Sequence, residues 1–92
     1  MRQLMEMPPM ASPELIQSWA RTEGFLREAR AALPAEIAAT FSAELMQFEE
    51  FLEHNELGLA CDFLQGIIED ANYTSLALTR NLHKAAENMA RP

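Results

Sequence analysis

The chain has 92 residues, 49% of them hydrophobic, with 14 acidic against 7 basic side chains and a net charge of −7. This length favours one domain with a single core over an enzyme with a deep cleft between two lobes. The acidity disfavours nucleic acid as a partner, because a phosphate backbone repels a negative surface, and the lone Cys61 excludes an internal disulfide.

The first residues are rich in methionine and proline. Pro8, Pro9 and Pro13 disfavour helix before residue 13, so we expect residues 1–12 to form a mobile arm and residues 13–92 a single helical domain. The start has no continuous apolar segment typical of a secretory signal. No stretch approaches the roughly 18–20 apolar residues that cross a bilayer. We therefore expect a cytoplasmic protein without a membrane partner.

Two helices are expected in the first half of the domain. Ser12 is predicted to cap the first, with Pro13 at the first helical position, where its missing N–H costs nothing. That helix should end before Pro34. Its apolar residues recur at helical spacing: Leu15, Ile16, Trp19, Leu26, Ala29 and Leu33. A second helix is predicted over residues 35–53 from the apolar stripe of Ile37, Phe41, Leu45, Phe48 and Leu52.

Two further helices are expected after a break at His54 and Asn55, since asparagine tolerates left-handed backbone angles. The third, over residues 56–71, has an inner face of Leu57, Ala60, Cys61, Leu64, Ile67, Ile68 and Ala71. Thr74 is predicted to cap the fourth, over residues 75–90. Its inward residues are Leu78, Leu82, Ala86 and Met89, and its outward ones are Arg80, Lys84, Glu87 and Arg91. Four amphipathic helices with short connections predict an all-α, antiparallel four-helix bundle.

Charge is segregated along the chain. No lysine or arginine occurs between Arg30 and Arg80, whereas nine carboxylates do: Glu36, Glu44, Glu49, Glu50, Glu53, Glu56, Asp62, Glu69 and Asp70. A surface selected only for solubility mixes both signs. On the predicted second helix, Met46 and three of the glutamates point away from the apolar stripe. They form either a solvated helix face or a docking surface for a basic partner.

The third helix adds two apolar residues to this acidic region. Leu59 and Phe63 fall outside its inner face, beside Asp62, Gly66 and Asp70. Such a pair is typical of an interface anchor with a polar rim, but also of a helix buried on two sides or of a homodimer seam. The predicted partner-binding residues are Met46, Glu49, Glu50, Glu53, Glu56, Leu59, Asp62, Phe63 and Asp70.

The sequence gives no pattern for catalysis or for metal binding. His54 and Cys61 do not belong to a C-x-x-C, H-x-x-x-H or E-x-x-H pair. Nothing in the sequence links either histidine to a nucleophile, as covalent catalysis requires. We therefore expect no enzyme activity, no metal site and no cofactor.

The segment Phe48–Leu64 resembles the MafI-like proteins, small helical immunity proteins of bacterial polymorphic-toxin systems, and the likeness extends over residues 45–70. The positions that match the pattern are Glu53, His54, Asn55, Glu56, Leu57, Leu59 and Ala60. Cys61 departs from it, because a larger aliphatic residue is usual there. The resemblance implies a cytoplasmic antidote that sequesters a cognate toxin, often a nuclease or another basic domain.

The same residues also have a purely architectural interpretation. A tight corner between two helices needs polar residues at the end of the first helix, a capping residue and an acidic residue at the start of the second. Glu53 and His54, Asn55 and Glu56 supply these three features in turn. Two functional hypotheses follow. The first is an immunity-type inhibitor whose carboxylates mimic a polyanionic substrate of a basic toxin. The second is a homodimeric structural or regulatory module that associates through Leu59 and Phe63.

Overall fold

The computed structural model describes residues 12–90, and most of the expected N-terminal arm lies outside these residues. The chain forms five helices: α1 (Pro13–Ala31), α2 (Ala35–Thr40), α3 (Ser42–Glu53), α4 (Leu57–Ala71) and α5 (Leu76–Ala90). Residues 12–90 contain no strand, which confirms the all-α prediction. None of the helices described is both long enough and apolar enough to cross a membrane.

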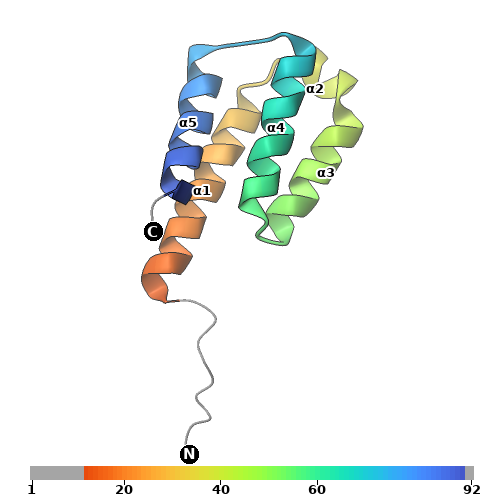
Figure 1. The fold of residues 1–92 in the computed structure, drawn as a ribbon. Helices are drawn as coiled ribbons and strands as arrows, with labels where there is room; N and C mark the ends of the chain where they lie inside the picture. The colour runs from red at the N-terminus through yellow and green to blue at the C-terminus, as the bar shows by residue number, and fades with distance from the viewer. Residues whose placement is uncertain (1–11, 91–92) are drawn as a thin grey trace, which may run out of the picture.

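The helices are arranged as two pairs. In Figure 1, α1 and α5 lie side by side and run in opposite directions, and α3 and α4 form a second such pair. The short α2 turns the chain between α1 and α3. The packing of α1 against α5 is the most extensive, and α4 contacts α5 far less. The two middle helices therefore form one side of the molecule, and the first and last form the other.

The start of α1 follows from local chemistry. The Ser12 hydroxyl accepts a hydrogen bond from the Leu15 amide at 3.1 Å, and Pro13 occupies the first helical position. Both features were expected from the preference of serine for N-caps and of proline for first turns. Pro34 also acts as expected, because α1 ends at Ala31 and α2 begins directly after the proline.

The helix predicted over residues 35–53 is in fact two helices. The backbone leaves helical geometry at Phe41 (φ −106°, ψ 31°), which separates α2 from α3. The Thr40 hydroxyl donates to the Glu36 carbonyl at 3.0 Å, a local bond that often accompanies a bend. The apolar stripe was predicted correctly. Such a stripe continues unchanged across one residue with non-helical backbone angles, so it did not predict the break at Phe41.

Two asparagines end helices in the left-handed conformation. Asn55 follows α3 with φ 58°, and Asn72 follows α4 with φ 53°. The amide of the next residue donates to a carbonyl five positions back, at 2.8 Å after Asn55 and 3.1 Å after Asn72. This pattern satisfies carbonyls at the helix end, and asparagine accepts the required positive φ better than most residues.

The cap of α5 is Ser75, not Thr74 as predicted. The Ser75 hydroxyl accepts from the Leu78 amide at 3.1 Å. We expect Ser75→Ala to lower the free energy of unfolding by about 1 kcal/mol, because an orphan amide loses its partner. Urea unfolding measures this loss. Thr74→Ala is the control and should change stability by less than about 0.5 kcal/mol; an equal loss in both variants would contradict the assignment of the cap.

The core lies between the two helix pairs, and most of the predicted inner residues are in it. Its buried members are Leu26, Ala29, Leu33, Leu45, Phe48, Leu52, Leu57, Ala60, Leu64, Ile67, Ile68, Leu78, Leu82 and Ala85. Three of the predicted inner residues are exposed instead. Leu15 and Ile16 are 42% and 54% exposed, because the first turns of α1 project beyond its neighbours (Figure 1). Ala86 is exposed, and the adjacent Ala85 is buried in its place.

One polar contact is built into the packing of α1 against α5. The side-chain amide of Asn88 donates to the Thr22 hydroxyl at 2.7 Å and to the Ser18 carbonyl and hydroxyl at 2.9 and 3.2 Å. Thr22 is buried. A buried polar group with a single matching partner favours one register between two helices, since sliding either helix would leave it unpaired.

Candidate functional site

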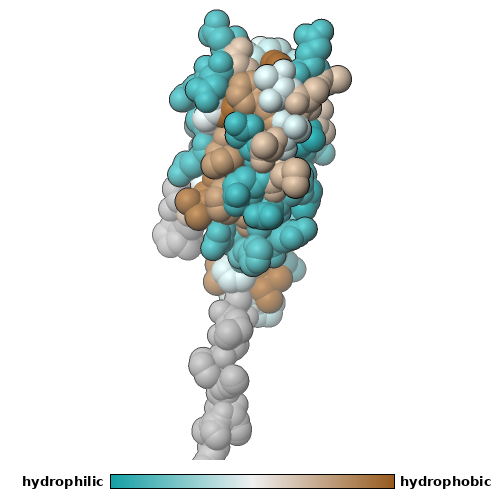
Figure 2. Space-filling model, turned by 90° about the vertical axis from the view of Figure 1, so that its right-hand side faces the viewer, coloured by the Kyte–Doolittle hydropathy of each residue, from teal (hydrophilic) through white to brown (hydrophobic). Residues whose placement is uncertain are grey.

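The outer face of α3 carries part of the predicted surface. Met46, Glu50 and Glu53 are spaced so that they share one face, opposite the buried Leu45 and Phe48. Met46 is 69% exposed. Figure 2 shows this side of the molecule, with hydrophilic atoms over much of its lower half and apolar atoms toward one edge.

Glu49 belongs to a different environment. Its carboxylate accepts a hydrogen bond from Arg27 of α1 at 3.1 Å, and Arg27 also pairs with Glu23 at 2.9 Å. The hydrogen bond to Glu23 raises the pKa of Arg27. Burial opposes this rise, and the contact with Glu49 adds to it, so that the pKa is raised overall. Glu49 is therefore paired with α1, unlike the other glutamates predicted on this face. Arg30 also lines a hollow with Met46 and Glu49, so cations border this edge of α3.

The outer face of α4 forms a groove with the start of α3, which we call the α3–α4 groove. It has a volume of about 170 Å³ and is lined by Phe41, Glu44, Asp62, Phe63, Gly66, Ile67 and Asp70. Phe63 is half-buried, because its ring packs edge-on against Phe51 of α3, with the centroids 5.5 Å apart and the planes at 73°. The groove thus combines aromatic lining with three carboxylates.

Most carboxylates of α3 and α4 have no cationic partner within the part of the chain that is described. The ion pairs within residues 12–90 join Arg27 to Glu23 and to Glu49, and His83 to Glu87. None includes Glu44, Glu50, Glu53, Asp62 or Asp70. The described basic residues lie on α1 and α5 instead, where the Lys84 ammonium sits 5.8 Å from the centre of the Phe25 ring. The charge segregation of the sequence is therefore also a segregation in space.

The remaining predicted residues, Glu56 and Leu59, lie where α4 begins. Glu56 is exposed at the N-cap of α4, and Leu59 is 51% exposed one turn further along. The structure therefore separates the nine predicted residues into an α3 face, an α4 face and the paired Glu49. Phe41 and Glu44 were missed as groove residues. Only the packing of α3 on α4 brings them opposite Asp62 and Asp70.

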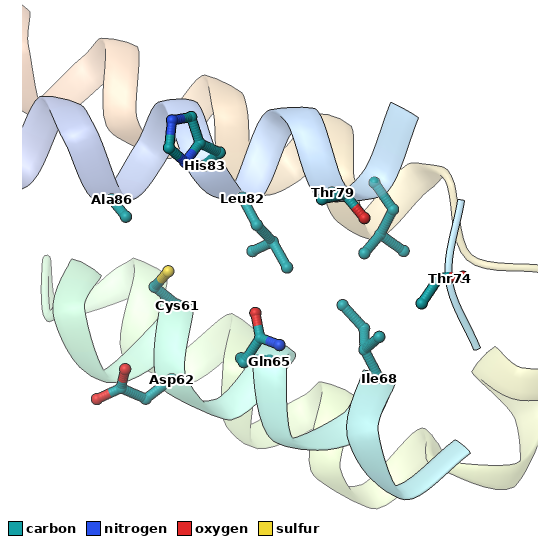
Figure 3. Close-up of a pocket in the computed structure, with 10 residues that line it drawn as sticks. Cys61, Asp62, Gln65, Ile68, Thr74, Thr79, Leu82, His83 and Ala86 are labelled. Carbon is teal, nitrogen blue, oxygen red and sulfur yellow. The ribbon is translucent and has the colours of Figure 1, made fainter. Parts of the chain in front are cut away.

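A second groove lies between α4 and α5, with a volume of about 430 Å³. In Figure 3, Leu82 and Ile68 point into it, and Asp62 and His83 point away. Cys61 lines it and is half-buried, not interior as predicted. Burial, and then the nearby Asp62, raise the pKa of the Cys61 thiol. A thiol with a raised pKa is mostly protonated at neutral pH and is a weak nucleophile.

The described titratable groups do not converge on a reactive centre. His83 is highly exposed and lies 3.6 Å from the Glu87 carboxylate on the same helix. Within residues 12–90, no three His, Cys, Asp or Glu side chains are placed to hold a metal ion. What the arrangement offers is a negative, partly apolar surface for binding.

Comparisons of the chain with protein-family models, with curated proteins and with solved structures find no match. Within residues 12–90, the carboxylates of α3 and α4 other than Glu49 make no ion pair, and the lysines and arginines lie on α1 and α5.

Proposed function

We propose that the protein is an immunity-type inhibitor that binds a basic toxin domain through the acidic surface of α3 and α4 and thereby blocks the toxin's active surface. In this proposal the four longer helices act as an antiparallel four-helix bundle, and the protein works in the cytoplasm. The resemblance of residues 45–70 to MafI-like immunity proteins supports the proposal.

The observation that carries the proposal is that the carboxylates of α3 and α4 other than Glu49 make no ion pair within residues 12–90. Glu50, Glu53, Asp62 and Asp70 make no ion pair with the described residues, so their charge is available to a partner. Like-signed charge on one side creates a field that steers an oppositely charged protein and speeds association. An active site that binds polyanionic nucleic acid is positive, so a carboxylate surface of this kind is complementary to it.

A co-expression assay tests the function. The toxin to be tested is a basic C-terminal domain of a large secreted protein, chosen where such a protein is found to be encoded beside this chain, and it is expressed in a bacterial host with and without the present protein. We expect the toxin domain alone to stop growth and co-expression to restore it. Continued growth arrest, with no complex between the two purified proteins, would refute the proposal.

A charge-reversal pair tests the surface. Glu50→Lys combined with Glu53→Lys should slow association with the basic toxin domain about tenfold at low salt, and less at high salt, because screening weakens steering. Biolayer interferometry measures the rate. Glu14→Lys combined with Glu28→Lys changes two exposed carboxylates of α1 and the net charge equally, but should have the smaller effect. Equal slowing in both variants would show that overall charge, not this surface, sets the rate.

A homodimeric module is the second candidate, and one observation favours it. Leu59 is 51% exposed on the outer face of α4, one helical turn from the half-buried Phe63, and aromatic residues are enriched at protein interfaces. Light scattering over a range of concentrations separates the candidates. A monomer at every concentration would remove the second, whereas a tight dimer lost on Leu59→Glu would support it.

A further inference from the structure

We infer that the α3–α4 groove receives an arginine side chain of the basic partner. This inference rests on the proposed function and specifies how its binding surface works. The size of the groove, its aromatic lining and its carboxylates together identify the occupant.

The size of the groove excludes most small ligands. Its volume is about 170 Å³, whereas pockets for drug-sized molecules and cofactors measure roughly 300–1,000 Å³. A space of this size suits one long side chain projecting from a larger molecule. The expected occupant is therefore part of a protein that also contacts the surrounding surface.

The lining fits a cation with an apolar stem. Glu44 approaches from α3, and Asp62 and Asp70 from α4, one turn on either side of Gly66. None of the three pairs with a lysine or arginine of residues 12–90. Phe41 and Phe63 supply half-buried aromatic surface. A negative groove with aromatic walls is complementary to a positive, partly apolar group.

Arginine matches this lining better than lysine does. Its planar guanidinium donates two parallel hydrogen bonds to one carboxylate and stacks on aromatic rings, whereas lysine presents a compact, strongly hydrated charge. Arginine is also among the residues most enriched at the energetic centres of protein interfaces. We therefore assign the groove to arginine rather than to any cation.

Gly66 provides a way to close the groove without disturbing the core. A Cβ atom placed on Gly66 meets no atom within 4 Å, so a side chain there would extend into the groove. Replacing a glycine inside a helix also raises helix propensity, so Gly66→Gln should fold. Gly24 of α1 is the matched control: it also lies inside a helix with open space at its Cβ, but on another part of the molecule.

The test uses hexa-arginine and hexa-lysine peptides titrated into ¹⁵N-labelled protein at low salt. We expect the largest amide shift changes near Phe63, Gly66 and Ile67, and binding of hexa-arginine at least threefold tighter than of hexa-lysine. Gly66→Gln should weaken hexa-arginine binding at least fivefold, and Gly24→Gln should leave it unchanged. Equal affinity for both peptides, or equal binding by both glutamine variants, would overturn the inference.

The peptide test and the growth assay fail independently. If hexa-arginine does not select the groove but co-expression still restores growth, the inference is wrong and the proposed function stands. If the peptide binds as expected but growth is not restored, the groove recognises arginine and the immunity role is wrong.

Discussion

Replacing Phe48 by alanine is expected to lower the free energy of unfolding by about 3–5 kcal/mol, because the ring is removed from a core that cannot fully collapse around the cavity. Phe48 is 0% exposed and heads the group of large, fully buried side chains. It lies on α3, facing the other helices. Urea unfolding followed by circular dichroism measures the loss.

Met46→Ala is the matched control for this change. It removes a large apolar side chain from the same helix, but Met46 is 69% exposed, so stability should change by less than about 0.5 kcal/mol. Similar losses in the two variants would contradict the orientation of α3 and, with it, the placement of Glu50 and Glu53 on an outer face.

The second large effect is expected at Asn88. Asn88→Ala should lower the free energy of unfolding by about 1–3 kcal/mol, because the buried Thr22 hydroxyl loses the amide that bonds to it at 2.7 Å. Thermal and urea unfolding both report this loss.

Asn81 gives the comparison on the same helix. Its amide donates to the Ala77 carbonyl at 2.9 Å in an exposed position, so water can replace that bond and Asn81→Ala should cost less than about 0.5 kcal/mol. If Asn88→Ala proved as mild as Asn81→Ala, the contact between α1 and α5 would not be a significant source of stability.

Much of the fold could be predicted because its signals are local. Ser12 and Pro13 act through the first turn of one helix, and Asn55 and Asn72 through single backbone angles. Such features depend on neighbours a few residues away, which the sequence displays directly. The interruption at Phe41 was missed because a continuous apolar stripe fits both one bent helix and two short ones.

The errors in burial have a different origin. Leu15 and Ile16 have the spacing of core residues, but α1 extends past the neighbouring helices at that point, and within residues 12–90 no other helix covers them fully. Ala85 replaces Ala86 in the core because an offset of one residue turns a helix face by about 100°. Tertiary packing sets the lengths of the helices and their rotation relative to one another. The apolar periodicity within one helix carries no information about that packing.

The candidate site could be predicted in its chemistry but not in its geometry. The run of carboxylates without cations was evident, and Glu50, Glu53, Asp62 and Asp70 have no ion-pair partner among residues 12–90. The ion pair between Glu49 and Arg27 joins α3 to α1. The groove is lined by Phe41 and Glu44 at the start of α3 and by residues of α4. Both depend on contacts between distant segments.

Hydrogen–deuterium exchange of a complex with the proposed basic toxin domain tests most directly whether the carboxylate-bearing helices are the ones that a partner covers. We predict that complex formation slows amide exchange in residues 42–71 and leaves residues 13–31 unchanged. Slowed exchange in residues 13–31 and 76–89, with none in 42–71, would show that the toxin binds the opposite pair of helices and would contradict the account.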